Sequence, residues 1–132
     1  MGVDSWLFIP FEDLRVFQLA EKLADEIWNI VIKWEYFEKD TIGKQLVRST
    51  DSIGANIAEG AGRGTANDNR RFIRISRGSL YETRFWLRRA SKRSLVSKQQ
   101  AELIRGILNE LGPSLNAYLT SIGKEKQPNT KY

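Results

Sequence analysis

Apolar residues recur at the three- and four-residue spacing of a helix in four segments of the chain. No segment shows the strict apolar and polar alternation that is typical of a half-buried strand. The pattern predicts helices over residues 12–34, 41–59, 65–93 and 97–122. Because the connections between them are short and the chain has no internal repeat, we expect an all-α fold, an antiparallel up-and-down four-helix bundle.

The predicted bundle domain spans residues 11–122. An apolar N-terminal leader (1–10) precedes it, and a C-terminal tail (123–132), expected to be disordered, follows it. At 132 residues the chain has room for one domain with a real core, although self-association would add useful burial.

Residues suited to helix ends mark the boundaries. Gly60 is expected to end the second helix in a left-handed conformation. Thr65 is placed to cap the third helix, with Asp68 three residues later, and Ser97 is placed to cap the fourth. The apolar phase continues across Pro113, so the sequence predicts a kink there and not a break.

The third predicted helix carries a cationic line along one face. Its spacing alternates between three and four residues, and it holds one aromatic residue and no carboxylate. The members of this line are Arg70, Arg74, Arg77, Tyr81, Arg84, Arg88 and Lys92. A mostly apolar stripe is expected on the opposite, buried face. That stripe consists of Phe72, Ile75, Ser79, Thr83, Trp86 and Ala90.

The positive charge of the chain is concentrated around this helix. Residues 63–93 hold ten Lys or Arg against Asp68 and Glu82, a local net charge of +8, whereas the whole chain carries +5. Nine of those ten cations are Arg, which binds phosphates as a fork and stacks on bases. We therefore expect the cationic line, together with Arg63 in the preceding glycine-rich loop, to bind RNA or DNA. A surface for an acidic protein partner, or an ordinary solvated helix face, are the alternatives.

Composition limits the chemistry that the chain can perform. It contains no Cys and no His, which removes disulfides, thiol nucleophiles, cysteine-based metal sites and the usual general acid or base. No complete catalytic constellation remains, so we expect neither an enzyme nor a cofactor. No run approaches transmembrane length and none resembles a secretion signal, so the cytoplasm is the expected location.

A polar network is expected where small residues cluster. Residues 52–60 are rich in Gly, Ala and Ser, which let two helix backbones approach closely. The polar residues expected near this seam are Ser49, Asn56, Glu59 and Glu82, with Glu82 angled toward the core. We expect them to form a structural network, and the alternative is a metal site built from Glu59 and Glu82.

Aromatic residues exceed what a small bundle would bury. Phe85 and Trp86 are adjacent in sequence, so one bundle core cannot cover both together with Leu87. They are expected to contact another copy of the chain in a homo-oligomer. The alternative is that the leader folds across its own bundle.

Several motifs resemble one bacterial family. They are Phe-Glu-Asp-Leu at 11–14, Gln-Leu-Val-Arg at 45–48, Ser-Ile at 52–53, Asn-Ile-Ala-Glu-Gly-Ala-Gly-Arg at 56–63 and Gly-Ser-Leu-Tyr-Glu-Thr at 78–83. The chain resembles the four-helix-bundle family named after proteins encoded in intervening sequences of 23S ribosomal RNA. That resemblance implies an up-and-down bundle, assembly as a cyclic homopentamer and no enzymatic activity.

A related branch comprises the accessory variability proteins of diversity-generating retroelements, which bind a reverse transcriptase and nucleic acid. Arg-Phe-Trp-Leu-Arg at 84–88 is similar to that branch. The resemblance implies a basic, oligomeric, non-catalytic adaptor that assists a reverse transcriptase. The alternative is a protein-interaction scaffold of the wider family, in which the arginines bind an acidic protein.

Overall fold

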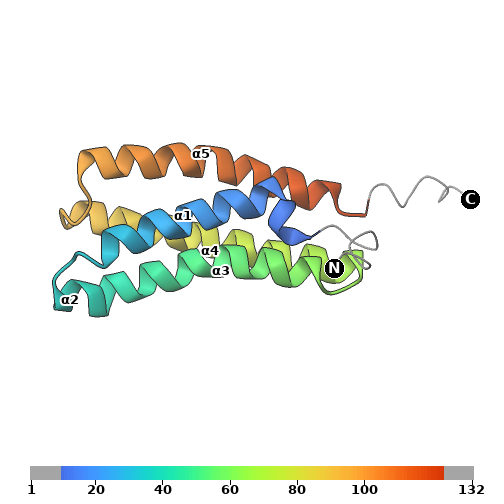
Figure 1. Ribbon diagram of the computed structural model, residues 1–132, viewed down its shortest axis with the longest axis horizontal. Coiled ribbons are helices and arrows are strands. Elements are labelled where there is room, and N and C mark those ends of the chain that lie inside the picture. Colours follow the sequence, from blue (N-terminus) through green and yellow to red (C-terminus); the bar gives the residue numbers. More distant parts are fainter. Residues whose placement is uncertain (1–9, 124–132) are drawn as a thin grey trace, which may run out of the picture.

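A computed structural model describes residues 10–123, which fold into four long helices lying side by side (Figure 1). The long helices are α1 (Arg15–Val31), α3 (Lys44–Ala61), α4 (Ala66–Lys92) and α5 (Lys98–Ser121). No strand occurs within the described range, so the prediction of an all-α fold with four packed helices is confirmed. The predicted leader and tail lie outside the described residues, except for Pro10 and Gly123.

Two predicted helix starts differ from the structure. A short 3-10 turn, η1 (Phe11–Asp13), precedes α1, and the extended backbone of Leu14 separates the two. The predicted second helix begins earlier than expected, because α2 (Tyr36–Glu38) continues through a π-helical turn, η2 (Lys39–Gly43), into α3. This turn brings Gly43 so close to α1 that an added Cβ would lie 2.8 Å from Val31 Cγ1.

The predicted caps are present. The Thr65 hydroxyl accepts a hydrogen bond from the Asp68 amide at 3.1 Å, and Ser97 forms a reciprocal capping box with Gln100. Helix α5 continues across Pro113 without a break, as the apolar phase predicted. The Thr65 and Ser97 caps satisfy backbone amides that would otherwise lack a partner within the helix.

All four long helices contribute to one apolar core. Its largest fully buried side chains come from α1, α3, α4 and α5, and they are Leu23, Ile27, Leu46, Ile53, Ile57, Ile73, Leu111 and Leu115. Because each helix buries one stripe, the opposite stripes form the surface on which a site can be built.

Helices α3 and α4 form the most extensive contact in the bundle. Ser76 Oγ donates to the Ile53 carbonyl at 2.8 Å, and Thr83 Oγ1 lies 2.9 Å from Ser49 Oγ. Ser52 Oγ and Ser79 Oγ are also 2.9 Å apart. We call these hydrogen-bonded residues the hydroxyl seam, and they fix the rotation of α4 about its own axis relative to α3.

Gly60 has a different role from the one expected. It lies inside α3, and the positive φ of the following connection belongs to Gly64, at 94°. An added Cβ at Gly60 would lie 2.6 Å from Asn69 Oδ1 and 3.0 Å from Phe72 Cβ. Gly60 therefore allows α3 and α4 to approach each other closely.

The buried face of α4 is rotated from the predicted one. Its buried residues are Ile73, Ser76, Leu80, Thr83 and Ala90, whereas Ile75 is 43% exposed. The hydroxyls of Ser76 and Thr83 can be buried because the hydroxyl seam satisfies them. Consequently the cationic line lies beside the buried face of α4, about a third of a turn away, and not opposite it.

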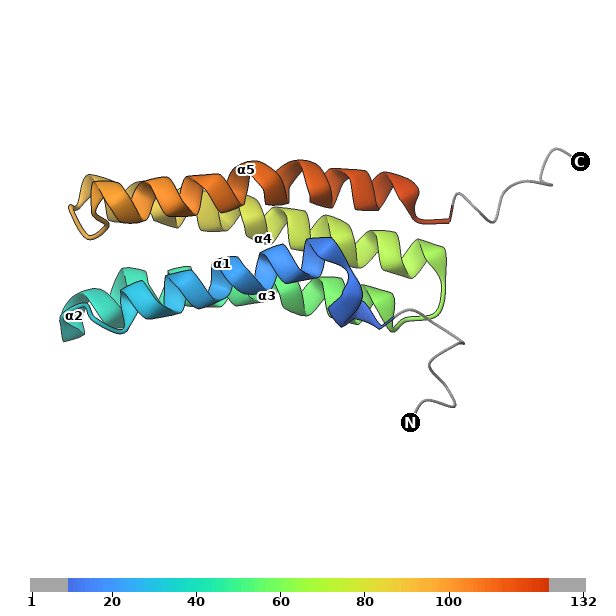
Figure 2. The same cartoon turned by 45° about the horizontal axis from the view of Figure 1, so that its top comes forward.

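Helix α5 packs mainly on α1, and its contact with α4 is sparse. In Figure 2, α5 and α4 lie along the upper side of the bundle and α1 and α3 along the lower side. None of the helices within residues 10–123 combines the length and the apolar character needed to cross a bilayer.

Gly60→Ala should destabilise the fold by about 1–3 kcal/mol, because its methyl group would overlap Asn69 and push against Phe72. The matched control is Gly78→Ala on the exposed side of α4, where an added Cβ meets nothing within 4 Å. That control should stabilise by roughly 0.5–1 kcal/mol, since alanine favours a helix. Chemical denaturation of both variants measures the difference, and equal stabilities would contradict the close α3–α4 approach.

Candidate nucleic-acid interface

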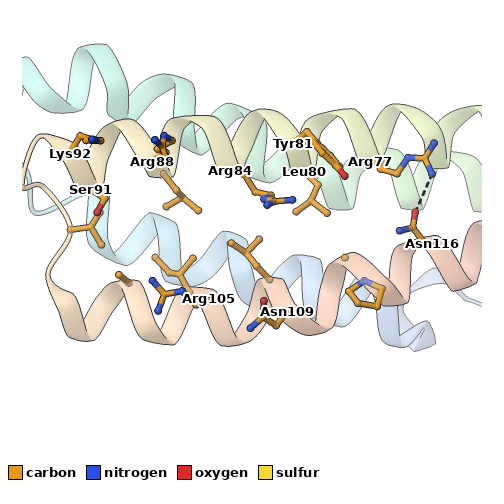
Figure 3. Close-up of a pocket in the computed structure, with 17 residues that line it drawn as sticks. Arg77, Leu80, Tyr81, Arg84, Arg88, Ser91, Lys92, Arg105, Asn109 and Asn116 are labelled. Carbon is orange, nitrogen blue, oxygen red and sulfur yellow. Dashed lines mark hydrogen bonds between the residues drawn. The ribbon is translucent and has the colours of Figure 1, made fainter.

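The cationic line of α4 borders a long hollow between α4 and α5. We call this hollow, of about 950 Å³, the α4–α5 groove. It exists because α5 is held by α1 and stands away from α4. Figure 3 shows side chains of both helices directed into the space between them.

Five cations line the α4–α5 groove, and its lining contains no carboxylate. Four of them belong to the cationic line and the fifth comes from α5. They are Arg77, Arg84, Arg88, Lys92 and Arg105. Their mutual repulsion in a confined space makes the groove attractive to an anion.

Apolar side chains form the floor of the groove. Leu80 and Ile104 are buried at its base, and Leu87 and Leu108 are partly buried beside them. Asn109 and Asn116 of α5 add amide groups that can donate and accept hydrogen bonds. The groove therefore combines cationic walls, an apolar floor and a few polar side chains.

Arg77 closes one end of the groove. Its Nη1 donates to Asn116 Oδ1 across the hollow at 3.1 Å, as Figure 3 shows. The other end lies at Ser91 and Lys92, beside the loop that joins α4 to α5. From residue 77 to residue 92 the helix rises about 22 Å, which is the length of the basic wall.

The members of the cationic line differ in how they are held. Arg70 Nη1 donates to the Ile122 carbonyl at 2.9 Å, so Arg70 is tied to the end of α5. Arg84 lies over the ring of Tyr81, 5.3 Å from its centre, and Arg74 and Arg88 are exposed. Within residues 10–123 no ion pair involves any member of the line.

Arg63 belongs to a different environment. It lies 3.7 Å from both the Glu59 and the Asp68 carboxylates, and its guanidinium faces the ring of Phe72. Its charge is therefore partly balanced within the chain, and the structure does not bring it to the α4–α5 groove.

The expected polar network is only partly assembled. Ser49 belongs to the hydroxyl seam, and Asn56 Nδ2 donates to Ser52 Oγ at 2.9 Å. Glu82 is exposed and accepts a hydrogen bond from Trp86 Nε1 at 3.1 Å, so the expectation that it points to the core is wrong. No carboxylate needs to be buried, because hydroxyl groups, backbone carbonyls and the Asn56 amide satisfy the hydroxyl seam.

The two carboxylates of the alternative metal site lie far apart on the bundle. Gly60 lies against Asn69 and Phe72, whereas Ser49 lies against Thr83, so about 15 Å of helix separates Glu59 from Glu82 along the α3–α4 pair. Among residues 10–123 no group of three or more acidic side chains is arranged to hold a metal ion. The structure thus does not assemble the Glu59 and Glu82 site.

Phe85 and Trp86 lie on the outer side of α4. Phe85 is 52% exposed, and its ring makes an edge-on contact with Trp86 at 4.9 Å. Trp86 is half-buried and packs against the edge of the core. The surface also exposes Trp28, Ile32, Tyr36 and Phe37 near the α1–α2 end of the bundle.

A notch on the opposite side of the bundle, between α1 and α3, is lined by acidic residues. Its volume is about 410 Å³, and Glu21, Asp25 and Asp51 line it together with small and aromatic residues. Partial burial, and then the charge of Asp25, raise the pKa of the Asp51 carboxyl above its ordinary value. The two sides of the bundle therefore differ in charge, with cations lining the α4–α5 groove and carboxylates lining the notch.

Sequence reasoning missed the contribution of α5. Arg105, Asn109 and Asn116 are spaced by four and seven residues and therefore share one helix face. This spacing was a usable signal, but it points to the groove only when α5 is known to face α4.

The chain matches the model of the family described as 23S rRNA-intervening sequence protein over residues 12–117. Its fold is similar to the crystal structure of a protein of unknown function from the S23 ribosomal protein family of Bacteroides thetaiotaomicron. The TM-score is 0.71 at 24% identity, over 80% of this chain and 99% of that one. Comparison with curated proteins found no match.

Asp51→Asn should stabilise the protein at neutral pH, because it removes a partly buried charge that Asp25 repels. The gain should be only a few tenths of a kcal/mol, since solvent screens most of this repulsion. A raised carboxyl pKa means that the folded state binds a proton more readily than the unfolded chain. The ionised carboxylate therefore lowers the free energy of unfolding at pH values above the folded pKa. The gain should shrink as the pH falls through that pKa and vanish below the unfolded value. Thermal melts at pH 7 and pH 3 measure it, and a constant gain would contradict the assignment.

Proposed function

The chain belongs to the 23S rRNA-intervening sequence protein family, and within that family we propose that it is a non-catalytic adaptor that binds RNA or DNA. The observation that supports this proposal best is the α4–α5 groove, which five cations line without a carboxylate. A solvated helix face would mix charges to gain pairing, whereas this line has no ion pair within residues 10–123.

The binding residues of the proposal are the members of the cationic line. Phosphate contacts supply affinity without reading sequence, so binding should tolerate many sequences. Arg63 has a minor part, because Glu59 and Asp68 already balance its charge.

We further propose that the protein acts as a homo-oligomer and assists a reverse transcriptase. Support for assembly comes from the exposed apolar side chains on α1, α2 and α4, including Phe85. Support for the reverse transcriptase is the resemblance of residues 84–88 to the accessory proteins of diversity-generating retroelements. An adjacent reverse-transcriptase gene with a template and variable repeat pair would agree with this role. A gene inside a ribosomal RNA intervening sequence would contradict it.

Binding of labelled RNA or DNA should weaken steeply as salt rises, with a log-log slope of about −0.7 to −0.9 per phosphate neutralised. The combined reversal of Arg74, Arg84 and Arg88 to Glu should lower affinity by at least about 100-fold at low salt. The melting temperature should change little, since all three side chains are exposed. Fluorescence anisotropy at two salt concentrations measures the effect.

The matched control reverses three exposed cations of the α1–α3 side, namely Lys22 on α1, Lys33 in the turn after α1 and Arg48 on α3. It changes the net charge equally, but it should retain most of the affinity because these residues lie away from the α4–α5 groove. An equal loss in both variants would show that net charge, and not the line, drives binding. Absence of binding at about 50 mM salt would favour the scaffold with an acidic protein partner.

Light scattering at micromolar concentration should return a mass well above the 15.2 kDa of one chain, and five times that mass for a pentamer. Phe85→Glu should shift the mass toward the monomer, because a charge at the exposed aromatic patch opposes its burial. Leu103→Glu, at a comparably exposed apolar position on α5, is the control and should leave the mass unchanged. A monomeric wild type would remove the assembly proposal.

A further inference from the structure

We infer that the α4–α5 groove binds a single strand of nucleic acid and places bases on its apolar floor, in preference to a duplex. This inference rests on the proposed function and adds the strandedness of the ligand. The observation behind it is that the groove has cationic walls and an apolar floor, which includes Leu80 and Ile104.

The position of α4 in the bundle opposes binding of a duplex along its length. The major groove is about 12 Å wide and admits one helix, whose diameter with side chains is about 10–12 Å. Helix α4 is flanked by α3 on one side and by α5 on the other, so it cannot enter that groove alone. A duplex could therefore meet only the outer rim of the cationic line.

The floor of the α4–α5 groove favours unpaired bases. In a duplex the base faces are stacked inside, and leucine and isoleucine side chains gain nothing from the phosphates. A single strand can turn its bases inward while its phosphates stay near Arg84, Arg88 and Arg105. A cavity of about 950 Å³ lies at the upper end of the volumes that hold drug-sized ligands, which suits a few linked nucleotides.

Tyr81 offers an aromatic face at the wall of the groove. Its side chain is 62% exposed, and Arg84 lies 5.3 Å from the ring centre. An aromatic ring beside a guanidinium is a suitable platform for stacking a base whose phosphate contacts the cation.

The first test fills the groove without changing its charge. Gly112 lines the groove, and an added Cβ there meets nothing within 4 Å, so Gly112→Leu places a side chain in the hollow. Gly106→Leu is the matched control, because Gly106 lies on the same helix, is equally unobstructed and does not line the groove. Anisotropy with a labelled oligouridine and with a duplex of equal length and label measures both affinities for each protein.

We expect the wild type to bind the single strand at least about tenfold more tightly than the duplex. Gly112→Leu should remove that preference by weakening single-strand binding alone, and Gly106→Leu should keep it. Tyr81→Ala provides a second variant that does not depend on the packing of α5. It should lower single-strand affinity about fivefold or more, whereas Tyr36→Ala on the exposed α2 should not.

Equal affinity for strand and duplex, unchanged by Gly112→Leu and Tyr81→Ala, would overturn the groove inference and leave phosphate binding by the cationic line intact. Failure of both ligands to bind would overturn the proposed function as well. Binding of an acidic helical peptide that Gly112→Leu abolishes, without single-strand binding, would assign the groove to a protein partner and overturn both.

Discussion

The hydroxyl seam between α3 and α4 is the constraint on which the rest of the surface depends. Ser76 and Thr83 are fully buried, and each has a hydrogen-bond partner on α3. Rotation of α4 by one residue would bury an arginine and leave these hydroxyls and their partners unsatisfied, at a cost of about 1–3 kcal/mol for each group. The seam therefore fixes the direction of every other side chain on α4, including the cationic line.

The α4–α5 groove follows from that orientation. The close approach at Gly60 packs α4 against α3. The ion pair between Arg15 and Glu110, at 2.8 Å, is one of the contacts that join α5 to α1. Neither pairing draws α4 and α5 together, and five cations between them repel one another. The hollow thus follows from the pairing of α4 with α3 and of α5 with α1, together with repulsion among the cations between α4 and α5.

Sequence periodicity sufficed for the four helices because caps such as Thr65 and Ser97 act locally. Periodicity did not predict the buried face of α4 correctly, because it assigns residues to the core by their apolarity. Apolarity alone predicts Ile75 in the core and Ser76 outside it, but Ser76 is the buried one because the Ile53 carbonyl of the partner helix satisfies its hydroxyl. The same limit applies to the site: the cationic line is visible in one helix, but Arg105 joins it only through the packing of α5 on α1.

The distribution of charge decides how an anion would approach the bundle. Arg63 and Arg71 lie close to Asp68, and both guanidinium groups face Phe72, so the cations at the start of α4 are partly balanced. From Arg74 to Lys92 no such carboxylate partner exists among the described residues. The acidic notch between α1 and α3 repels the same ligand from the opposite face. On the proposed function, this distribution of charge would direct a polyanion toward the α4–α5 groove before any specific contact forms.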